Sequence, residues 1–394
     1  MPLSIRDQRR QLVPFAALSA SYFAHIGFFN PYLSLWLKDL GYGIFAISLL
    51  TSVQAASRLF APYAWGALSD HTGERVKLMR YSATAALVLS FGLWFELGLG
   101  ALMLLMLLMF THTSSMMPMS EAAMAHLVSQ GGSFDARRYG RVRLWGSVGF
   151  LVTVFLAGAW FERFGMHHFP AWTGVTLLAV VLSVWWMPDV KEAAHAHSDK
   201  LPVLPVLRQP AVQWFFASVF FHVLSHMGIY VFFSLYLDEL GYSKTMIGVF
   251  WAVSVVVEIG WFFTQSRWLG RFSLSAWLII CAVAMVVRLI LTASSASVLW
   301  VLLLAQLLHA LTFAAHHAVC IASLSEHFAG QLRGRGQALY TVIGYGFPGV
   351  LGSLLGGVLV SNYGLASVYW ASLATSLIAT VSAYQVWRLQ RARR

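Results

Sequence analysis

The chemistry open to this chain lies in a few ionisable side chains that interrupt long apolar stretches. Apolar runs of about 20 residues predict membrane-spanning helices, and Glu121, Glu258 and Arg288 each fall inside such a run. Ionisable groups inside a bilayer are costly, so they indicate a substrate site, an ion pathway or a proton relay. We therefore expect Glu258 and Arg288 to act in function, with a permanent pairing between helices as the alternative.

Two further arginines lie nearer to the ends of their apolar runs. Arg58 falls in the second run and Arg143 lies just inside the fifth. Arg58 and Glu258 are 200 residues apart, which matches the spacing of an internal repeat described below. Both arginines are close to helix ends. For them, a structural role that holds helices in register is therefore a stronger alternative to a functional role.

Histidines in the apolar runs could exchange protons, because an imidazole titrates near neutral pH. Helical spacing places His309, Phe313 and His316 on one face of the tenth run. His222 and His226 share a face of the seventh run. A hydrogen-bonded core histidine is the ordinary alternative for each of them. The His222/His226 pair has no convergent carboxylate in the sequence, so we predict no metal site.

Aromatic residues deep in the apolar runs could line a substrate cavity. Tyr230, Trp251 and Phe313 are the main candidates. Contact with lipid or packing between helices explains such residues equally well, since aromatic side chains also serve as membrane anchors.

The composition predicts a protein that crosses a membrane many times. Hydrophobic residues make up 59% of the chain and charged residues 10%, whereas soluble domains carry about 25% charged residues. Both cysteines, Cys281 and Cys320, fall in apolar runs, so no disulfide framework is predicted. Twelve runs could span a bilayer, at about 14–37, 44–67, 79–98, 100–126, 142–163, 169–187, 210–237, 244–264, 274–293, 297–323, 336–361 and 364–387.

Basic residues are distributed unevenly between the two sides. If the N-terminus is cytoplasmic, 21 of the 26 lysines and arginines lie in or beside cytoplasmic segments. This asymmetry predicts that both termini are in the cytoplasm. It also accounts for the net charge of +11 without nucleic acid.

The chain reads as two related halves joined by a polar linker. Residues 33–42 are LSLWLKDLGY and residues 233–242 are FSLYLDELGY, with six identical positions at an offset of 200. The polar, proline-containing stretch between the halves cannot lie in hydrocarbon. We predict an N-terminal six-helix bundle at 1–188, a cytoplasmic linker at 189–209 and a C-terminal six-helix bundle at 210–394. An internal repeat of this kind is typical of transporters.

The loop after the second run carries a recognisable motif. Residues 66–75 read GALSDHTGER, which resembles the Gly-x-Leu-x-Asp-x-x-Gly-x-Arg loop of the major facilitator superfamily. The resemblance implies an all-α membrane fold of twelve helices in two pseudo-symmetric bundles. It also implies that Asp70 and Arg75 act in gating, and we add Arg58 as a further gating candidate.

A closer resemblance covers nearly the whole chain. The segment YGRVRLWGSVGF at 139–150 resembles the start of helix 5 in lactose permease-like proton symporters, and the phenylpropionate permease family is more similar still. The resemblance implies that Glu121 and Arg143 bind substrate, and that Glu258, Arg288 and His309 resemble coupling residues. Where that pattern has a proton-carrying glutamate, this chain has Thr312, so the proton would be carried by Glu258, His309, His316 or Glu121.

These observations lead to one main expectation. The chain is expected to be a monomeric transporter of the bacterial inner membrane, not an enzyme, that takes up a small aromatic carboxylate such as phenylpropionate. The proton gradient would supply the energy, and no cofactor is expected. The alternatives are a neutral nucleoside or oligosaccharide as substrate, transport in the efflux direction, or an enzyme or receptor in a transporter-like shell. We assign Arg143, Arg288, Glu121, Tyr230, Trp251 and Phe313 to substrate binding, and Glu258, His309 and His316 to proton coupling.

Overall fold

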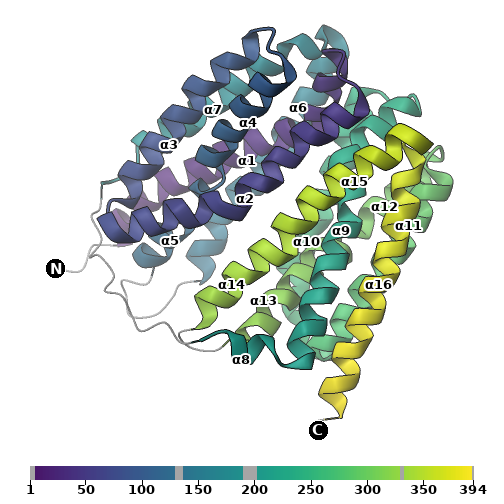
Figure 1. Ribbon diagram of the computed structural model, residues 1–394. Coiled ribbons are helices and arrows are strands. Elements are labelled where there is room, and N and C mark those ends of the chain that lie inside the picture. The colour runs from purple at the N-terminus through teal and green to yellow at the C-terminus, as the bar shows by residue number, and fades with distance from the viewer. Residues whose placement is uncertain (1–4, 129–135, 190–201, 329–331, 393–394) are drawn as a thin grey trace. The chain divides into compact units, whose positions relative to one another are not determined.

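The computed structural model describes residues 5–128, 136–189, 202–328 and 332–392. Over these residues the secondary structure is helical, with no β-strand (Figure 1). Part of the predicted linker, residues 190–201, lies outside the described residues.

The first half of the chain forms a series of long helices and short 3₁₀ turns. Its elements are α1 (Ile5–Asp39), α2 (Ile44–Thr72), α3 (Arg75–Ser90), η1 (Phe91–Trp94), α4 (Leu99–Thr113), α5 (Met116–Val128), α6 (Ala136–Phe164), η2 (Met166–His168) and α7 (Phe169–Trp185).

The second half repeats this pattern with two interruptions by π-helix. Its elements are α8 (Leu204–Leu207), α9 (Pro210–Glu239), α10 (Lys244–Thr264), η3 (Gln265–Arg267), η4 (Leu269–Arg271), α11 (Leu274–Ser295), α12 (Leu299–Leu307), the π-helix η5 (Ala310–Ala315), α13 (His316–His327), α14 (Arg333–Thr341), the π-helix η7 (Val342–Gly346), α15 (Phe347–Tyr363) and α16 (Ala366–Arg391).

Eleven helices among the described residues are long and apolar enough to cross a membrane. They coincide with eleven of the twelve predicted spans. The remaining prediction, 79–98, falls on α3 and the 3₁₀ turn η1, where the regular helix stops at Ser90. Three basic residues in the first turns of α3 lower the hydropathy of this segment. The chain therefore has the all-α, twelve-helix architecture that was expected.

By packing, the chain divides into two compact units. The first comprises Met1–Leu40 and Ser57–His197, and the second comprises Gly41–Ala56 and Ser198–Arg394. The start of α2 thus packs with the second unit. The predicted bundle boundaries at 188 and 210 stay a prediction.

Within each unit, the helix that contains most of the repeated segment packs against several other helices. In the first unit, α1 runs along α6 and α7. In the second, α9 runs along α16 and α15, and α11 also packs on α16 (Figure 1). Close approach depends on small residues: a Cβ added at Gly149 of α6 would collide with the backbone carbonyl of Ala20 on α1.

The two halves of the repeat also end in the same local structure. α1 and α9 both finish before a Leu-Gly-Tyr segment, in which Gly41 has φ +85° and Gly241 has φ +83°. This left-handed conformation is accessible to glycine at little cost and ends each helix in the same way. The sequence repeat therefore corresponds to a repeated backbone geometry.

Candidate functional site

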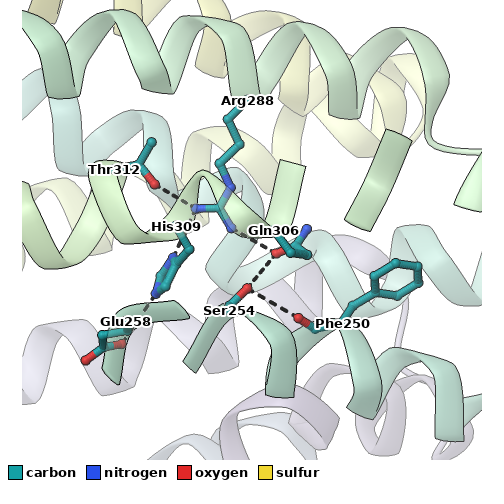
Figure 2. A network of polar contacts seen from close by, with 7 residues as sticks. All are labelled: Phe250, Ser254, Glu258, Arg288, Gln306, His309 and Thr312. Carbon is teal, nitrogen blue, oxygen red and sulfur yellow. Dashed lines mark hydrogen bonds and ion pairs between the residues drawn. The ribbon is translucent and has the colours of Figure 1, made fainter. Parts of the chain in front are cut away.

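Arg288 is the centre of a buried polar network in the second unit. Its side chain comes from the middle of α11 and is 1% exposed. Its Nη1 donates to Thr312 Oγ1 at 2.9 Å and to His309 Nδ1 at 3.1 Å, and its Nη2 donates to Gln306 Oε1 at 2.9 Å (Figure 2). Its Nε is buried without a hydrogen-bond partner among the described residues.

The contact with Arg288 fixes the tautomer of His309. A guanidinium only donates hydrogen bonds, so the Nδ1 of a neutral His309 must be the acceptor and its hydrogen must lie on Nε2. His309 Nε2 lies 3.6 Å from Glu258 Oε2 (Figure 2). His309 therefore stands between Arg288 and Glu258, and the network does not show the direct Arg288–Glu258 pair considered from the sequence.

Uncharged polar residues complete the network. Ser254 of α10 donates to Gln306 Oε1 at 2.7 Å, and Thr292 donates to the carbonyl oxygen of Arg288 at 2.9 Å. Gln306 and Ser254 were not predicted from the sequence, because neither side chain is ionisable or aromatic. Gln306 could have been identified from the sequence, because it is an amide in an apolar run. It precedes His309 by three residues, which places the two side chains on the same helix face.

A change of helix type positions these groups. η5 is a π-helix between α12 and α13. Single π-turns within α-helices are rare and often occur at functional sites. His309 precedes η5 and Thr312 lies within it, so the wider turn directs the Thr312 hydroxyl toward Arg288 while its carbonyl oxygen accepts from His222 at 2.7 Å.

The remaining histidines form a stacked group beside this network. The ring of His316 stacks on that of His222 with centroids 3.7 Å apart, and the ring of His226 lies 5.2 Å from His222. His316 contacts Cys320 Sγ at 3.6 Å. The predicted coupling residue His316 therefore adjoins His222 rather than Glu258.

The predicted aromatic residues lie near the same helices. Phe313 stacks on His309 at 5.0 Å and Tyr230 stacks on His226 at 5.3 Å. Trp251 Nε1 donates to Ser234 at 3.1 Å, which ties α10 to α9. Phe313 and Tyr230 thus place aromatic faces directly against the histidines, whereas Trp251 packs between helices.

The predicted substrate pair of the first unit is an ion pair. Arg143 Nε of α6 lies 3.4 Å from Glu121 Oε1 of α5, and both side chains are more than one-third exposed. The guanidinium also lies over the ring of Phe23 at 4.2 Å. The structure therefore brings Glu121 and Arg143 together, and α1 contributes an aromatic face to them.

Two of the three predicted gating residues, Asp70 and Arg75, form a local contact within the first unit. Arg75 donates to Asp70 Oδ1 at 3.3 Å and to Ser69 at 3.1 Å, which closes the turn between α2 and α3. Arg58 lies half-buried on α2, about three helical turns before Ser69 along the chain. Among the described residues, no three His, Cys, Asp or Glu side chains converge as metal ligands would.

Comparisons with known proteins agree with this architecture. The "Probable 3-phenylpropionic acid transporter" of Escherichia coli (strain K12) is 25% identical over 364 residues, covering 91% of this chain and 93% of that protein. A "Maltose permease" of Geobacillus stearothermophilus is 23% identical and covers 88% of this chain and 87% of its own length.

Solved structures share the fold at lower identity. The nucleoside transporter NupG superposes with a TM-score of 0.82 at 15% identity, over 96% of this chain and 99% of that one. A bacterial homologue of the human lysosomal transporter Spinster has a TM-score of 0.69, also at 15% identity, and covers 99% of this chain and 98% of that one.

The family model described as "MFS_1 like family" matches residues 17–371, which is nearly the whole chain. With the twelve-helix architecture and transporter relatives along nearly the whole length, the chain belongs to the MFS_1-like family of multi-pass membrane transporters.

Proposed function

We propose that this transporter takes up a small aromatic carboxylate, such as phenylpropionate, together with a proton. The observation that carries the proposal is Arg288, a guanidinium that is 1% exposed and whose described hydrogen-bond partners are all uncharged.

A buried cation without a counter-charge is costly, because its desolvation is not offset by a neighbouring anion. The carboxylate nearest to Arg288 in the network, Glu258, contacts His309 instead. A carboxylate ligand would supply the missing charge, and a guanidinium presents a planar fork that suits it. Nε of Arg288, which has no hydrogen-bond partner among the residues that the structure describes, gives such a ligand a donor.

The aromatic part of the substrate is supported by the residues around the network. Phe313 and Tyr230 place ring faces next to His309 and His226. Rings in offset or edge contact stabilise one another by about 0.5–1.5 kcal/mol beyond their burial. The relative at 25% identity is itself named for 3-phenylpropionic acid, which is an aromatic carboxylate.

The contact between Glu258 and His309 supports Glu258 as the residue that carries the transported proton. Glu258 is 23% exposed in its side chain and lies against the Nε2–H of His309. A protonated, uncharged Glu258 would attract that hydrogen less strongly, so a proton at this position would weaken the contact with His309 and, through His309, change the support of Arg288. Transport would occur by alternating access, in which two bundles open a central site to each side in turn. We expect a monomer in the bacterial inner membrane with cytoplasmic termini and no cofactor beyond the proton gradient.

A thermal-shift screen on the purified protein tests the substrate class. A ligand that binds the folded state raises its melting temperature by mass action. We expect aromatic acids to raise it and the corresponding amides, sugars and nucleosides not to do so. Stabilisation by the amide equal to that by the acid would contradict the proposal.

A neutral substrate is the second candidate, favoured by the Glu121–Arg143 pair. The pair is accessible and has no net charge, so it could bind the hydroxyl groups of a nucleoside or oligosaccharide. One relative is a maltose permease and a structural neighbour is a nucleoside transporter. Stabilisation by nucleosides or sugars alone in the same screen would support this candidate. Efflux is the alternative direction, and inverted membrane vesicles that accumulate substrate would reveal it.

A further inference from the structure

Two buried histidines of α9, His222 and His226, each have one ring nitrogen with no partner in the part of the chain that the structure describes. His222 Nε2 lies 2.7 Å from the carbonyl oxygen of Thr312. A carbonyl oxygen only accepts, so Nε2 carries the hydrogen and, in the neutral ring, Nδ1 is the bare basic nitrogen. His226 Nδ1 lies 3.4 Å from the carbonyl oxygen of His222, and Nε2 is then bare by the same argument. Within the described part of the chain, both bare nitrogens are buried and have no hydrogen-bond partner.

Both histidines lie close to the charge of Arg288. Thr312 connects His222 to it, because its carbonyl oxygen accepts from His222 and its hydroxyl accepts from Arg288 Nη1 at 2.9 Å. The ring of His226 is 6.5 Å from that of His309, whose Nδ1 accepts from Arg288. In this buried setting a proton on either histidine would be repelled by the guanidinium, since charges interact strongly at low dielectric.

We propose that His222 and His226 together form a proton site that fills when an anion neutralises Arg288. The inference rests on the proposed function, because it needs a carboxylate bound at that arginine. The proton comes from the solvent or a buffer acid and forms one N–H bond at His222 Nδ1 or His226 Nε2. The two rings are 5.2 Å apart, so a second proton would meet a like charge and only one is bound.

The other groups around the two histidines do not supply the negative charge that the bound anion would bring. Glu258 contacts His309, and His316, which stacks on His222, can be neutral or cationic but not anionic. Aromatic hydroxyls near the arginine and the histidines are neutral at physiological pH. The titratable and charged groups on the elements around the pair are of two kinds. Those next to its rings are Tyr230 on α9, His309 before η5 and His316 on α13. Those one contact further away are Glu258 on α10, Arg288 on α11, Cys320 on α13 and, near Arg288, Tyr369 on α16.

The arrangement couples substrate to proton by charge alone. If the anion increases the proton affinity of the pair, the proton must increase the affinity for the anion by the same factor. Binding of the acid should therefore take up a proton and should strengthen as the pH falls. A neutral ligand would leave Arg288 charged and would show neither effect.

Isothermal titration calorimetry of the purified full-length protein with phenylpropionate tests this inference. Titrations in two buffers with different ionisation enthalpies give the number of protons taken up per acid bound. The key variant is His222→Gln with His226→Asn. The Gln amide nitrogen matches the donor Nε2 of His222, and the Asn amide nitrogen matches the donor Nδ1 of His226. The hydrogen bonds to the carbonyls are kept while the basic nitrogens are removed.

The matched control is His25→Asn, which replaces another buried histidine in a long helix. His25 lies on α1 in the first unit and its Nδ1 contacts Thr176 Oγ1 at 3.0 Å. Melting temperatures of all variants establish that they are folded.

We expect the wild-type protein to take up about one proton per acid and to lose roughly tenfold in affinity between about pH 6 and about pH 8. The double variant should bind the acid with little proton uptake and little pH dependence, whereas His25→Asn should behave like the wild type. Unchanged proton uptake in the double variant would overturn the inference while the proposed function stands, because another group, such as Glu258, would then take up the proton. Absence of acid binding to the wild type would overturn the proposed function and this inference with it.

Discussion

At the scale of single residues, the main feature of the second unit is the buried cation Arg288, whose described hydrogen-bond partners are uncharged. Arg288 makes three hydrogen bonds to uncharged side chains and leaves Nε unpartnered among the described residues. His309 separates it from Glu258. The arginine and the carboxylate are thus connected but not neutralised by direct contact, which allows each to take a separate role.

Replacement of Arg288 by glutamine tests carboxylate recognition. Loss of a charge-assisted hydrogen bond costs about 1.5–3 kcal/mol, which is roughly a ten- to hundredfold loss of affinity. Arg288→Gln should weaken binding of an aromatic acid by this factor and barely change binding of its amide. Arg288→Lys should restore part of the affinity, because an ammonium is a point charge and not a fork.

The comparison of acid and amide distinguishes recognition from structural damage. If Arg288 served only to neutralise Glu258, the Arg288→Gln and Glu258→Gln variants would each be disabled and the double variant would recover much of its binding. Equal losses for acid and amide in Arg288→Gln would contradict carboxylate recognition.

Replacement of Glu258 by glutamine tests proton coupling. Glutamine keeps an oxygen that can accept from His309 Nε2 but cannot take up a proton. Glu258→Gln should abolish accumulation of substrate against its gradient and preserve exchange between internal and external substrate. Counterflow and uphill uptake assays in proteoliposomes measure the two activities. A variant that still concentrates substrate in a pH gradient would show that another residue carries the transported proton.

At the scale of helices, close packing and the π-helix η5 hold the site in place. η5 lets Thr312 contact Arg288 with its hydroxyl and His222 with its carbonyl. In the first unit, α1 and α6 approach closely at Gly149, where a Cβ would meet the backbone of Ala20. Backbone cannot move aside as a side chain can, so this contact depends on the absence of a side chain.

Replacement of Gly149 by alanine tests this packing. Overpacking typically costs about 1–3 kcal/mol, so we expect Gly149→Ala to lower the melting temperature in detergent clearly. Gly174→Ala on α7 is the matched control, because nothing lies within 4 Å of the added Cβ. It should be neutral or slightly stabilising, since alanine favours helix over glycine by roughly 0.5–1 kcal/mol. Equal melting temperatures for the two variants would contradict the inferred close contact.

At the scale of the whole molecule, the chain is a multi-pass transporter with two compact units. Asp70 and Arg75 close the turn between α2 and α3 in the first unit. The side chain of Asp70 is 60% exposed, so its pairing with Arg75 adds little to stability. An effect of this residue on transport would therefore come from a change of conformation and not from unfolding.

Replacement of Asp70 by asparagine tests the gating role. An exposed ion pair contributes about 0.2–1 kcal/mol, so the melting temperature should change little. Turnover should fall severalfold while substrate affinity stays close to that of the wild type, as measured by uptake kinetics and direct binding. Glu74→Gln is the matched control, because Glu74 pairs with Lys77 in the same region at 2.9 Å. A large loss of affinity with normal turnover would contradict a gating role for Asp70.

Much of the architecture was determined by the sequence alone. Apolar runs of spanning length predicted the helices because backbone groups in a bilayer must be hydrogen-bonded within the segment itself. The repeat at an offset of 200 residues indicated two related halves. In the structure, α1 and α9 end alike, because glycine at both positions permits the same left-handed turn. Glu258, Arg288 and His309 were identified because charged and titratable residues are rare in apolar runs.

The tertiary structure decided how these residues are connected. Only the packing of α10, α11 and η5 placed His309 between Arg288 and Glu258 and brought in Gln306 and Ser254. The π-helix that directs Thr312 has no signal in hydrophobic periodicity, and the bare nitrogens of His222 and His226 follow from which carbonyl oxygen each ring meets. Helix formation in a membrane depends on local composition, whereas the partner of a buried polar group depends on contacts between segments distant in the sequence.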